Sequence, residues 1–214
     1  MTAQLPPIPF SSWLRSAQAA LAEEESADVP CGSCNACCRT FHFIHVRPEE
    51  KRARARLPRG FLSPAPGLPP GNLVLGHDQA GRCPMLVSGR CTVYADRPLA
   101  CRTYDCRVYA ATGIAPDRDA IAEQVRRWTF GYPSQEDRGR QAAVLAAVRF
   151  MREHPECLPS DAARIQPVRV AVLAIAVHEA FLQDEPGSVA RSRLSDQDRA
   201  RAIAAANERL FGDG

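Results

Sequence analysis

Apolar and polar positions near the N-terminus of the chain repeat with the period of an α-helix. Between residues 10 and 25 the apolar side chains fall on one helical face: Trp13, Leu14, Ala17 and Leu21. This spacing predicts an amphipathic helix whose apolar face packs against the rest of the protein. Ser11 or Ser12 is expected at its N-cap, because a serine hydroxyl can accept a hydrogen bond from a free amide of the first turn.

After residue 115 the helical period returns in four longer segments. We expect helices over residues 119–128, 136–154, 167–183 and 195–211. One buried stripe of the second helix is expected to consist of Val144, Leu145, Val148 and Met151. Ser195 and Asp198 resemble a capping box in which aspartate replaces the usual glutamate. This half of the chain is therefore predicted to be a helical assembly.

The region between these helical parts has short elements punctuated by prolines. Aromatic and β-branched residues predict strands at 41–46 and 72–76. Residues 83–94 are expected to form two strands joined by a three-residue turn at 88–90, where Gly89 can adopt a positive φ. The predicted fold class is α+β, with a cysteine-bearing β-hairpin region and short helices beside a mainly helical C-terminal half.

Prolines also predict where short helices start and where regular structure stops. Pro48 is expected to open a helix that runs to residue 57, and Pro98 a helix that runs to residue 104. Asp96 lies close to the capping position of the second of these helices. The proline-rich segment 58–70 is expected to be a loop, because proline lacks the amide donor that a helix needs.

Composition indicates an ordinary folded protein. The chain has 214 residues, of which 45% are hydrophobic and 24% charged, with a formal net charge of +3. These values exclude a mainly disordered acidic or basic chain. The longest apolar run, residues 170–177, is too short to span a bilayer, and no early stretch has the features of a signal peptide. We therefore expect a cytoplasmic protein, in which the nine cysteines bind metal rather than form disulfides.

Eight of the nine cysteines fall into two groups of four. They are Cys31, Cys34, Cys37 and Cys38, followed by Cys83, Cys91, Cys101 and Cys106. Four thiolates satisfy tetrahedral zinc, and the same donors hold iron-sulfur clusters. The C-x2-C-x2-C spacing of the first group favours a cluster, whereas C-x2-C alone is equally a common zinc half-site. Zinc and an iron-sulfur cluster both remain open as the cofactor.

The adjacent pair Cys37 and Cys38 predicts that the two groups are interleaved. Neighbouring side chains leave a helix about 100° apart and leave a strand on opposite faces, so the two thiols are expected to serve different ions or to bridge a pair. Four thiolates around one zinc ion leave a net charge of about minus two, which needs nearby hydrogen-bond donors. The candidates for that role around the cofactor are Arg39, Arg97, Arg102 and Arg107.

Other candidate chemistry is weaker. His42 and His45 follow the first group closely, but eight thiols already fill two sites, and Cys157 is expected to pack as a small apolar residue. The basic run 47–59 lacks interleaved aromatic residues, so we interpret it as a solvated face rather than a nucleic-acid site. Phosphate-binding, dinucleotide-binding, serine-hydrolase and H-E-x-x-H motifs are absent from the sequence.

The cysteine region resembles a known family. The string CGSCNACC and the later string GRCPMLVSGRCTVYADRPLACRTYDC are similar to the YkgJ-like cysteine-cluster family, the CxxCxxCC group of zinc- or iron-chelating proteins. Besides the eight cysteines, the resemblance includes Pro84, Tyr94, Arg97, Pro98 and Arg102. It covers about residues 31–108 and implies a metal-chelating domain. The best-known relative is a flagellin lysine N-methylase, while the activity of most other members is unknown.

These observations predict three parts and a function. The parts are an N-terminal helix at 1–30, a metal-chelating region at 31–112 and a helical region at 113–214. The expected function is metal chelation in the cytoplasm through two groups of four cysteines, with no reaction identified. An iron-sulfur redox protein or methylase-related enzyme is one alternative. The other is a metal-stabilised module that binds a protein partner through its C-terminal helices. Membrane binding is not expected, and nucleic-acid binding is disfavoured.

Overall fold

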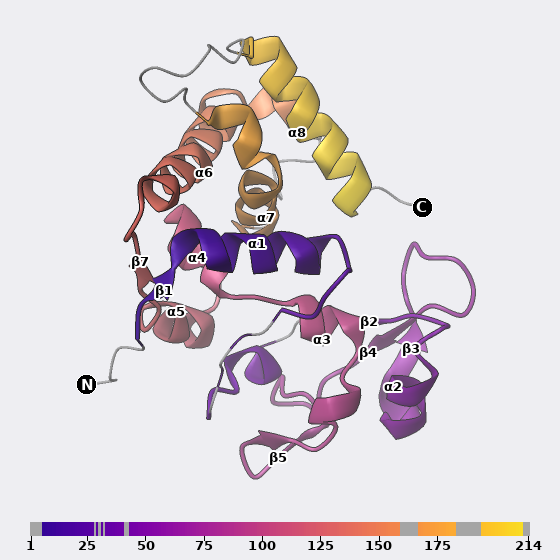
Figure 1. The fold of residues 1–214 in the computed structure, drawn as a ribbon. Helices are drawn as coiled ribbons and strands as arrows, with labels where there is room; N and C mark the ends of the chain where they lie inside the picture. Colours follow the sequence, from indigo (N-terminus) through magenta and orange to yellow (C-terminus); the bar gives the residue numbers. More distant parts are fainter. Residues whose placement is uncertain are drawn as a thin grey trace.

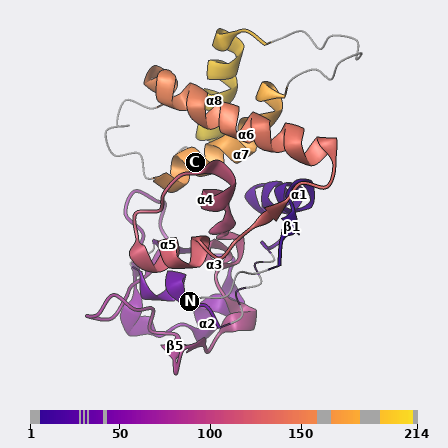
Figure 2. The same ribbon diagram turned by 90° about the vertical axis from the view of Figure 1, so that its left-hand side faces the viewer.

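A computed structural model describes residues 6–27, 29, 31, 33–40, 43–158, 167–182 and 194–211. Helices make up most of its regular structure, and three small sheets complete it, so the α+β class is confirmed. The longer helices gather at one end of the molecule and the short elements that carry most of the cysteines lie at the other (Figures 1 and 2). Within the described ranges no helix is long and apolar enough to cross a membrane.

The helical end is built around one large core. Its helices are α1 (Phe10–Leu21), α4 (Arg107–Thr112), α6 (Gln135–Glu153), α7 (Pro167–Val177) and α8 (Asp196–Phe211). α7 lies at the centre, since it contacts each of the other four. Its side chains Leu173 and Ile175 are fully buried beside Trp13 and Val144. The N-terminal helix therefore packs with the C-terminal half, and residues 22–106 leave this core and return to it.

Shorter elements surround the same core. They are α5 (Asp119–Val125), the 3-10 turns η4 (Pro155–Cys157) and η6 (His178–Phe181), and the parallel pair of β1 (Ile8–Pro9) with β7 (Phe130–Gly131). The β1–β7 pair joins the start of the described chain to the segment before α6. α1 is thereby held at both its N-terminal end and its apolar face.

One carboxylate organises the start of both α1 and α6. Asp137 accepts the backbone amide of Ser11 at 2.8 Å and that of Ser134 at 3.0 Å, and its own amide donates to the Ser134 hydroxyl. The last two bonds form a capping box on α6. The expectation that Ser11 or Ser12 caps α1 is wrong, because the helix already begins at Phe10 and Pro9 precedes it. The amide of Ser11 finds its acceptor on α6 instead.

The expected details of α6 and α8 are largely confirmed. Ser195 and Asp198 form the reciprocal bonds of a capping box, at 3.1 and 3.2 Å. In α6 the side chains of Val144, Val148 and Met151 are buried, but Leu145 is 37% exposed. The stripe instead continues through Ala143 and Ala147, on the other side of Val144. The prediction for Leu145 is wrong. Successive residues of a helix are rotated by about 100°, so the side chain that follows Val144 points away from the buried face.

The region outside the helical core is formed by short strands and turns. A three-stranded antiparallel sheet has the order β2 (Ile44–Val46), β4 (Leu73–Leu75), β3 (Leu62–Pro64). The strands at 41–46 and 72–76 are thus confirmed in their cores, while residues 41 and 42 lie outside the described residues. The loop expected at 58–70 contains η2 (Arg59–Phe61) and β3. Pro64 is tolerated there because β3 is an edge strand.

The predicted hairpin is present, with a shorter turn than expected. β5 (Leu86–Val87) pairs with β6 (Arg90–Cys91), and Val87 faces Arg90. The turn is therefore the two residues Ser88 and Gly89, which have φ of 48° and 77°. Two positive φ values in succession match the twist of a tight hairpin, and they place Arg90 in the strand rather than in the turn.

The two short helices of this region share one anchor. The carboxylate of Glu50 accepts the amide of Arg47 at 2.8 Å and the amide of Leu99 at 2.5 Å. It thus lies at the start of both α2 (Lys51–Arg56) and α3 (Leu99–Thr103). The start expected at Pro48 is three residues early. Asp96 caps neither helix, because it lies in the 3-10 turn η3 (Tyr94–Asp96) and pairs with Arg52 at 3.1 Å.

A second, smaller hydrophobic core lies under these elements. Its buried members are Ile44, Val46, Leu57, Leu75, Cys83 and Val93. The cysteines Cys38, Cys91 and Cys101 pack against it. Where the chain leaves and re-enters the helical core, the amide of Ala27 donates to the carbonyl of Arg102 at 2.8 Å. The two ends of the cysteine-bearing region are therefore hydrogen-bonded to each other.

Candidate metal centre

The first four cysteines lie on a tightly turned segment. The amide of Cys34 donates to the carbonyl of Cys31 at 2.8 Å, and the amide of Cys38 donates to that of Asn35 at 3.0 Å. The second of these turns is part of the 3-10 helix η1 (Ala36–Arg39). These turns hold four thiols within eight residues of chain, as the C-x2-C-x2-C spacing predicts.

Direct contacts join this segment to the second group of cysteines. The amide of Cys83 donates to the carbonyl of Cys38 at 2.8 Å. Asn35 donates its side-chain amide to the carbonyl of Gly89, in the hairpin turn, at 3.3 Å. The hairpin that carries Cys83 and Cys91 is therefore fixed against the first cysteine loop. The two groups, distant in sequence, are neighbours in the structure.

Cys101 and Cys106 reach the same place from the other side. Cys101 lies in α3, and Cys106 directly precedes α4. Cys106 is buried in the large core, and its Sγ accepts a hydrogen bond from the indole Nε1 of Trp128 at 3.3 Å. α3 and α4 thus bring two thiols from the second group to the boundary between the two hydrophobic cores.

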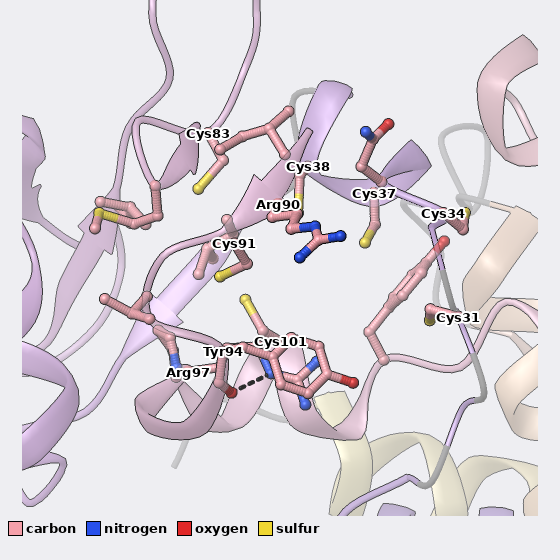
Figure 3. Close-up of a pocket in the computed structure, with 18 of the residues that line it drawn as sticks. Cys31, Cys34, Cys37, Cys38, Cys83, Arg90, Cys91, Tyr94, Arg97 and Cys101 are labelled. Atoms are coloured by element: carbon pink, nitrogen blue, oxygen red, sulfur yellow. Dashed lines mark hydrogen bonds between the residues drawn. The ribbon is translucent and has the colours of Figure 1, made fainter. Parts of the chain in front are cut away.

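Seven of the eight thiols line one cavity of about 710 Å³. Those seven are Cys31, Cys34, Cys37, Cys38, Cys83, Cys91 and Cys101, of which Figure 3 shows the side chains around the space. The eighth, Cys106, lines an adjoining cavity of about 230 Å³ together with Cys31, Cys34, Cys37 and Cys101. All nine cysteines, Cys157 included, are free thiols.

The thiols surround these cavities without forming a finished coordination sphere. Within the described ranges, no group of three or more His, Cys, Asp and Glu side chains is arranged closely enough to hold a metal ion. The structure therefore establishes which thiols are neighbours. Cysteine sulfurs drawn from both groups around one space are, as thiolates, a donor set that fits zinc or an iron-sulfur cluster.

Burial keeps most of these thiols protonated. It raises the pKa of the Cys31 thiol to about 11 and the pKa of Cys101 and of Cys106 to about 12, and neighbouring thiols add to the effect. Burial also raises the pKa of the Cys34 and Cys83 thiols. A thiolate in this environment needs a cation to stabilise it, so metal binding here must displace protons.

The adjacent cysteines differ from the others. The side chains of Cys37 and Cys38 form a hydrogen bond, which lowers the pKa of Cys37 to about 7 and raises the pKa of Cys38. Cys37 faces both cavities, whereas Cys38 lines only the larger one. The lowered pKa means that Cys37 loses its proton more readily than an ordinary cysteine thiol.

Arg97 is the arginine of the predicted four that faces the thiols. Its guanidinium stacks on the Tyr94 ring at 3.6 Å, its Nε donates to the Tyr94 carbonyl at 2.8 Å, and it lines both cavities. Its charge opposes the effect of burial on the thiols of Cys31 and Cys101 by lowering their pKa. Arg97 can therefore compensate thiolate charge in either cavity.

The other three predicted arginines lie elsewhere. Arg39 is exposed. Arg102 donates from Nε to the carbonyl of Arg97 at 3.2 Å, so it supports the segment on which Arg97 lies. Arg107 is buried and pairs with Asp105 at 2.9 Å. None of these three lines either cavity.

Sequence reasoning missed several residues of the site. Arg90 lines the larger cavity, and Figure 3 shows its side chain directed toward the cysteines. Trp128 binds Cys106, and Arg127 lowers the pKa of Cys34 against the effect of burial. Tyr104 is largely buried and lines both cavities. Position beside Cys91 could have indicated Arg90, and position between Cys101 and Cys106 could have indicated Tyr104. Arg127 and Trp128 come from a segment without a cysteine.

The remaining candidate residues lie outside the site. His45 bonds to Asn72 through Nε2 at 2.7 Å and lines neither cavity. His42 lies outside the described residues. Cys157 is in η4, packs against the helical core and lines neither cavity.

Comparison with known proteins gives one match. Residues 30–123 match the family model CxxCxxCC, which is described as a "Putative zinc- or iron-chelating domain". The matched segment contains all eight clustered cysteines and Arg97, and it ends within α5. No curated protein and no solved structure matches the chain.

Proposed function

We propose that this protein chelates zinc or iron through all eight clustered cysteines, since residues 30–123 match the CxxCxxCC family model. The observation that carries the proposal is the cavity with seven thiols on its walls, drawn from both groups. Cysteines that only filled a hydrophobic core would have no reason to gather around an open space. We also propose a reducing compartment such as the cytoplasm, where cysteine thiols are kept available for metal.

Charge supports the same proposal. Residues 31–112 contain twelve Lys and Arg but only five Asp and Glu, whereas the whole chain has a net charge of only +3. Two sites of four thiolates around a divalent ion would add a charge of about minus four. The positive surplus of the cysteine region has the sign needed to offset that charge, and Arg97 and Arg90 bring part of it to the cavity.

The chemistry of the bound metal is the second part of the proposal. Zinc would act as a structural ion that substitutes for the small size of the second hydrophobic core. An iron-sulfur cluster would add electron transfer or support of a methylation-type reaction. Two observations favour the iron-sulfur cluster as the alternative to zinc. They are the C-x2-C-x2-C turn and the cavity of about 710 Å³, since a single ion needs far less space.

A third candidate, a metal-stabilised interaction module, is favoured by exposed apolar side chains. Phe43 and Tyr94 are 59% and 54% exposed at the wall of the larger cavity, and Val87 is 55% exposed in the adjacent hairpin. The exposed apolar residues of the C-terminal helices, Leu145 and Phe211, are less accessible. A protein partner would therefore bind near the cysteines rather than on the C-terminal helices, where the sequence led us to expect it.

Metal analysis of anaerobically isolated protein tests the proposal. We expect zinc, or iron with inorganic sulfide, to remain bound through gel filtration, with visible charge-transfer absorption only for the cluster. Replacing Cys83 by serine should reduce the bound metal, whereas Cys157→Ser is the matched control and should leave it unchanged. Wild-type protein that folds and carries neither zinc nor iron would contradict chelation.

A further inference from the structure

We propose that the eight cysteines divide across the two sequence groups, with Cys31, Cys34, Cys37 and Cys106 as one ligand set and Cys38, Cys83, Cys91 and Cys101 as the other. This inference rests on the proposed metal-chelating function and specifies its sites. It differs from the division that sequence order suggests, in which each group of four forms a site. Each set exchanges one cysteine with the other relative to that order.

The two cavities give the first argument. Cys106 lines only the smaller cavity, where it meets Cys31, Cys34 and Cys37. Cys38, Cys83 and Cys91 line only the larger one. Cys31, Cys34, Cys37 and Cys101 line both cavities. The cavity walls therefore separate Cys106 from Cys38, Cys83 and Cys91, and leave the other four thiols to be assigned.

The two hydrophobic cores assign Cys101. All four members of the second set, Cys38, Cys83, Cys91 and Cys101, belong to or pack against the small core under the three-stranded sheet. Cys106 belongs to the large helical core, against which Ala36 and Tyr104 also pack. Cys31, Cys34 and Cys37 are not part of the small core. Counting four ligands for each site then places these three thiols with Cys106.

The arrangement of the thiols in space agrees with this assignment. Figure 3 shows their order across the cavity, with Cys31 and Cys34 on one side, Cys83 and Cys91 on the other, and Cys37 between them.

The arrangement makes Cys37 and Cys38 the junction of two neighbouring sites. They are consecutive residues of η1, so the two ligand sets meet at this pair. The backbone bond from Cys83 to the carbonyl of Cys38 ties the second set to the same point. Arg97, which lines both cavities, lies where one positive charge can serve both sites.

Cadmium-substituted wild-type protein gives a direct test without any variant. Cadmium–proton correlation NMR detects scalar coupling between each bound cadmium and the β-protons of its cysteine ligands. We expect one cadmium coupled to Cys31, Cys34, Cys37 and Cys106, and a second coupled to Cys38, Cys83, Cys91 and Cys101. Couplings that follow the two sequence groups, or a cysteine coupled to both cadmium ions, would overturn the division.

Two double variants test the division with the native metal. Cys34→Ser with Cys106→Ser damages one proposed set and leaves the other intact, whereas Cys83→Ser with Cys106→Ser damages both. After a chelator challenge that leaves the wild type loaded, we expect the first variant to keep half of the metal and the second to keep none. The opposite result would support sites that follow sequence order and overturn the proposal.

The outcomes separate this inference from the proposed function. Equal and complete loss in both double variants, with a loaded wild type, would indicate one merged centre and overturn the division alone. A wild type that binds no metal would overturn the function itself. Circular dichroism of each variant confirms that the helices remain folded, and the NMR measurement decides the division if a variant does not fold.

Discussion

The indole of Trp128 donates its Nε1 hydrogen to the sulfur of Cys106 at 3.3 Å. Trp128 follows α5, and Cys106 directly precedes α4, so a residue of the helical half contacts a candidate metal ligand. Burial dominates the pKa of Cys106 and raises it to about 12, while the indole hydrogen bond acts in the opposite direction. The hydrogen bond from Trp128 therefore favours the thiolate form of this cysteine, against the effect of burial.

Replacing Trp128 by phenylalanine should weaken metal binding at Cys106. The hydrogen bond that stabilises the thiolate is lost while most of the apolar volume remains, so we expect about a tenfold loss of affinity. Competition with a chelator measures it. Trp13→Phe is the control, because the Trp13 indole donates to Asp105 rather than to a sulfur. Equal affinity of the two variants would contradict a role for the N–H···S bond.

Asp105 should be important for stability. Its carboxylate pairs with the buried guanidinium of Arg107 at 2.9 Å and accepts the indole hydrogen of Trp13 at 2.9 Å. Replacing Asp105 by alanine removes the carboxylate from a buried ion pair, so we expect a loss of about 3–5 kcal/mol in the free energy of unfolding. Urea denaturation measures this loss.

An exposed ion pair provides the comparison for Asp105. Asp117 and Arg118 are 3.7 Å apart, and about half of each side chain is exposed. Asp117→Ala should therefore change the unfolding free energy by less than about 1 kcal/mol. Similar losses in the two aspartate variants would mean that burial of the Asp105–Arg107 pair carries no special weight.

The stability of the helical half should fall in acid because of Asp137. Hydrogen bonds from Ser134 and then from the Ser11 amide lower the pKa of this carboxyl below its usual 3.8. A folded-state pKa below the unfolded one adds stability above the unfolded pKa, and this contribution is lost as the pH falls through the folded value. The relevant window therefore lies below about pH 4.

An isosteric variant isolates the contribution of Asp137. Asp137→Asn should be less stable than the wild type near neutral pH, and the difference should shrink on acidification below about pH 4. Thermal unfolding followed by circular dichroism at several pH values measures both effects. A difference that stays constant with pH would exclude Asp137 as their source.

Metal removal should affect the two cores unequally. Among the residues that the structure describes, the small core has six buried apolar side chains. Thiolate-bound zinc contributes on the order of 10 kcal/mol to the folding of comparable domains. Removal of the metal by an added chelator should therefore increase hydrogen exchange in β2, β4 and the hairpin, while the amides of α6 and α7 stay protected. Unchanged protection in the strands of fully metal-free protein would contradict a structural role for the metal.

Periodicity and cysteine spacing predicted the elements that depend on local sequence. The helices at 136–154 and 195–211 are present within one residue at each end, because capping residues and an apolar stripe define them locally. The strand around Val74 and the hairpin were also correct, and the cysteine pattern led to the family that matches residues 30–123. These features need only residues that are near each other in the chain.

Features that depend on distant contacts were not predictable. α1 does not start with a serine cap, and the amide of Ser11 donates to Asp137 on α6. Glu50 anchors two helices whose first residues are 48 positions apart. Trp128 lies 22 residues after Cys106, in a segment without cysteines. Periodicity does not report such pairs, since only the folded chain brings the two residues together.

The return of the chain to its first helix has a consequence for biosynthesis. α1 packs against α6 and α7, which are translated more than a hundred residues later. The apolar face of α1, which carries Trp13 and Leu14, therefore emerges from the ribosome before α6 and α7 are made. The cysteine region is synthesised in the interval. The apolar face of α1 therefore has to be protected from aggregation during synthesis, while the cysteines that follow it in the chain are already available to metal ions.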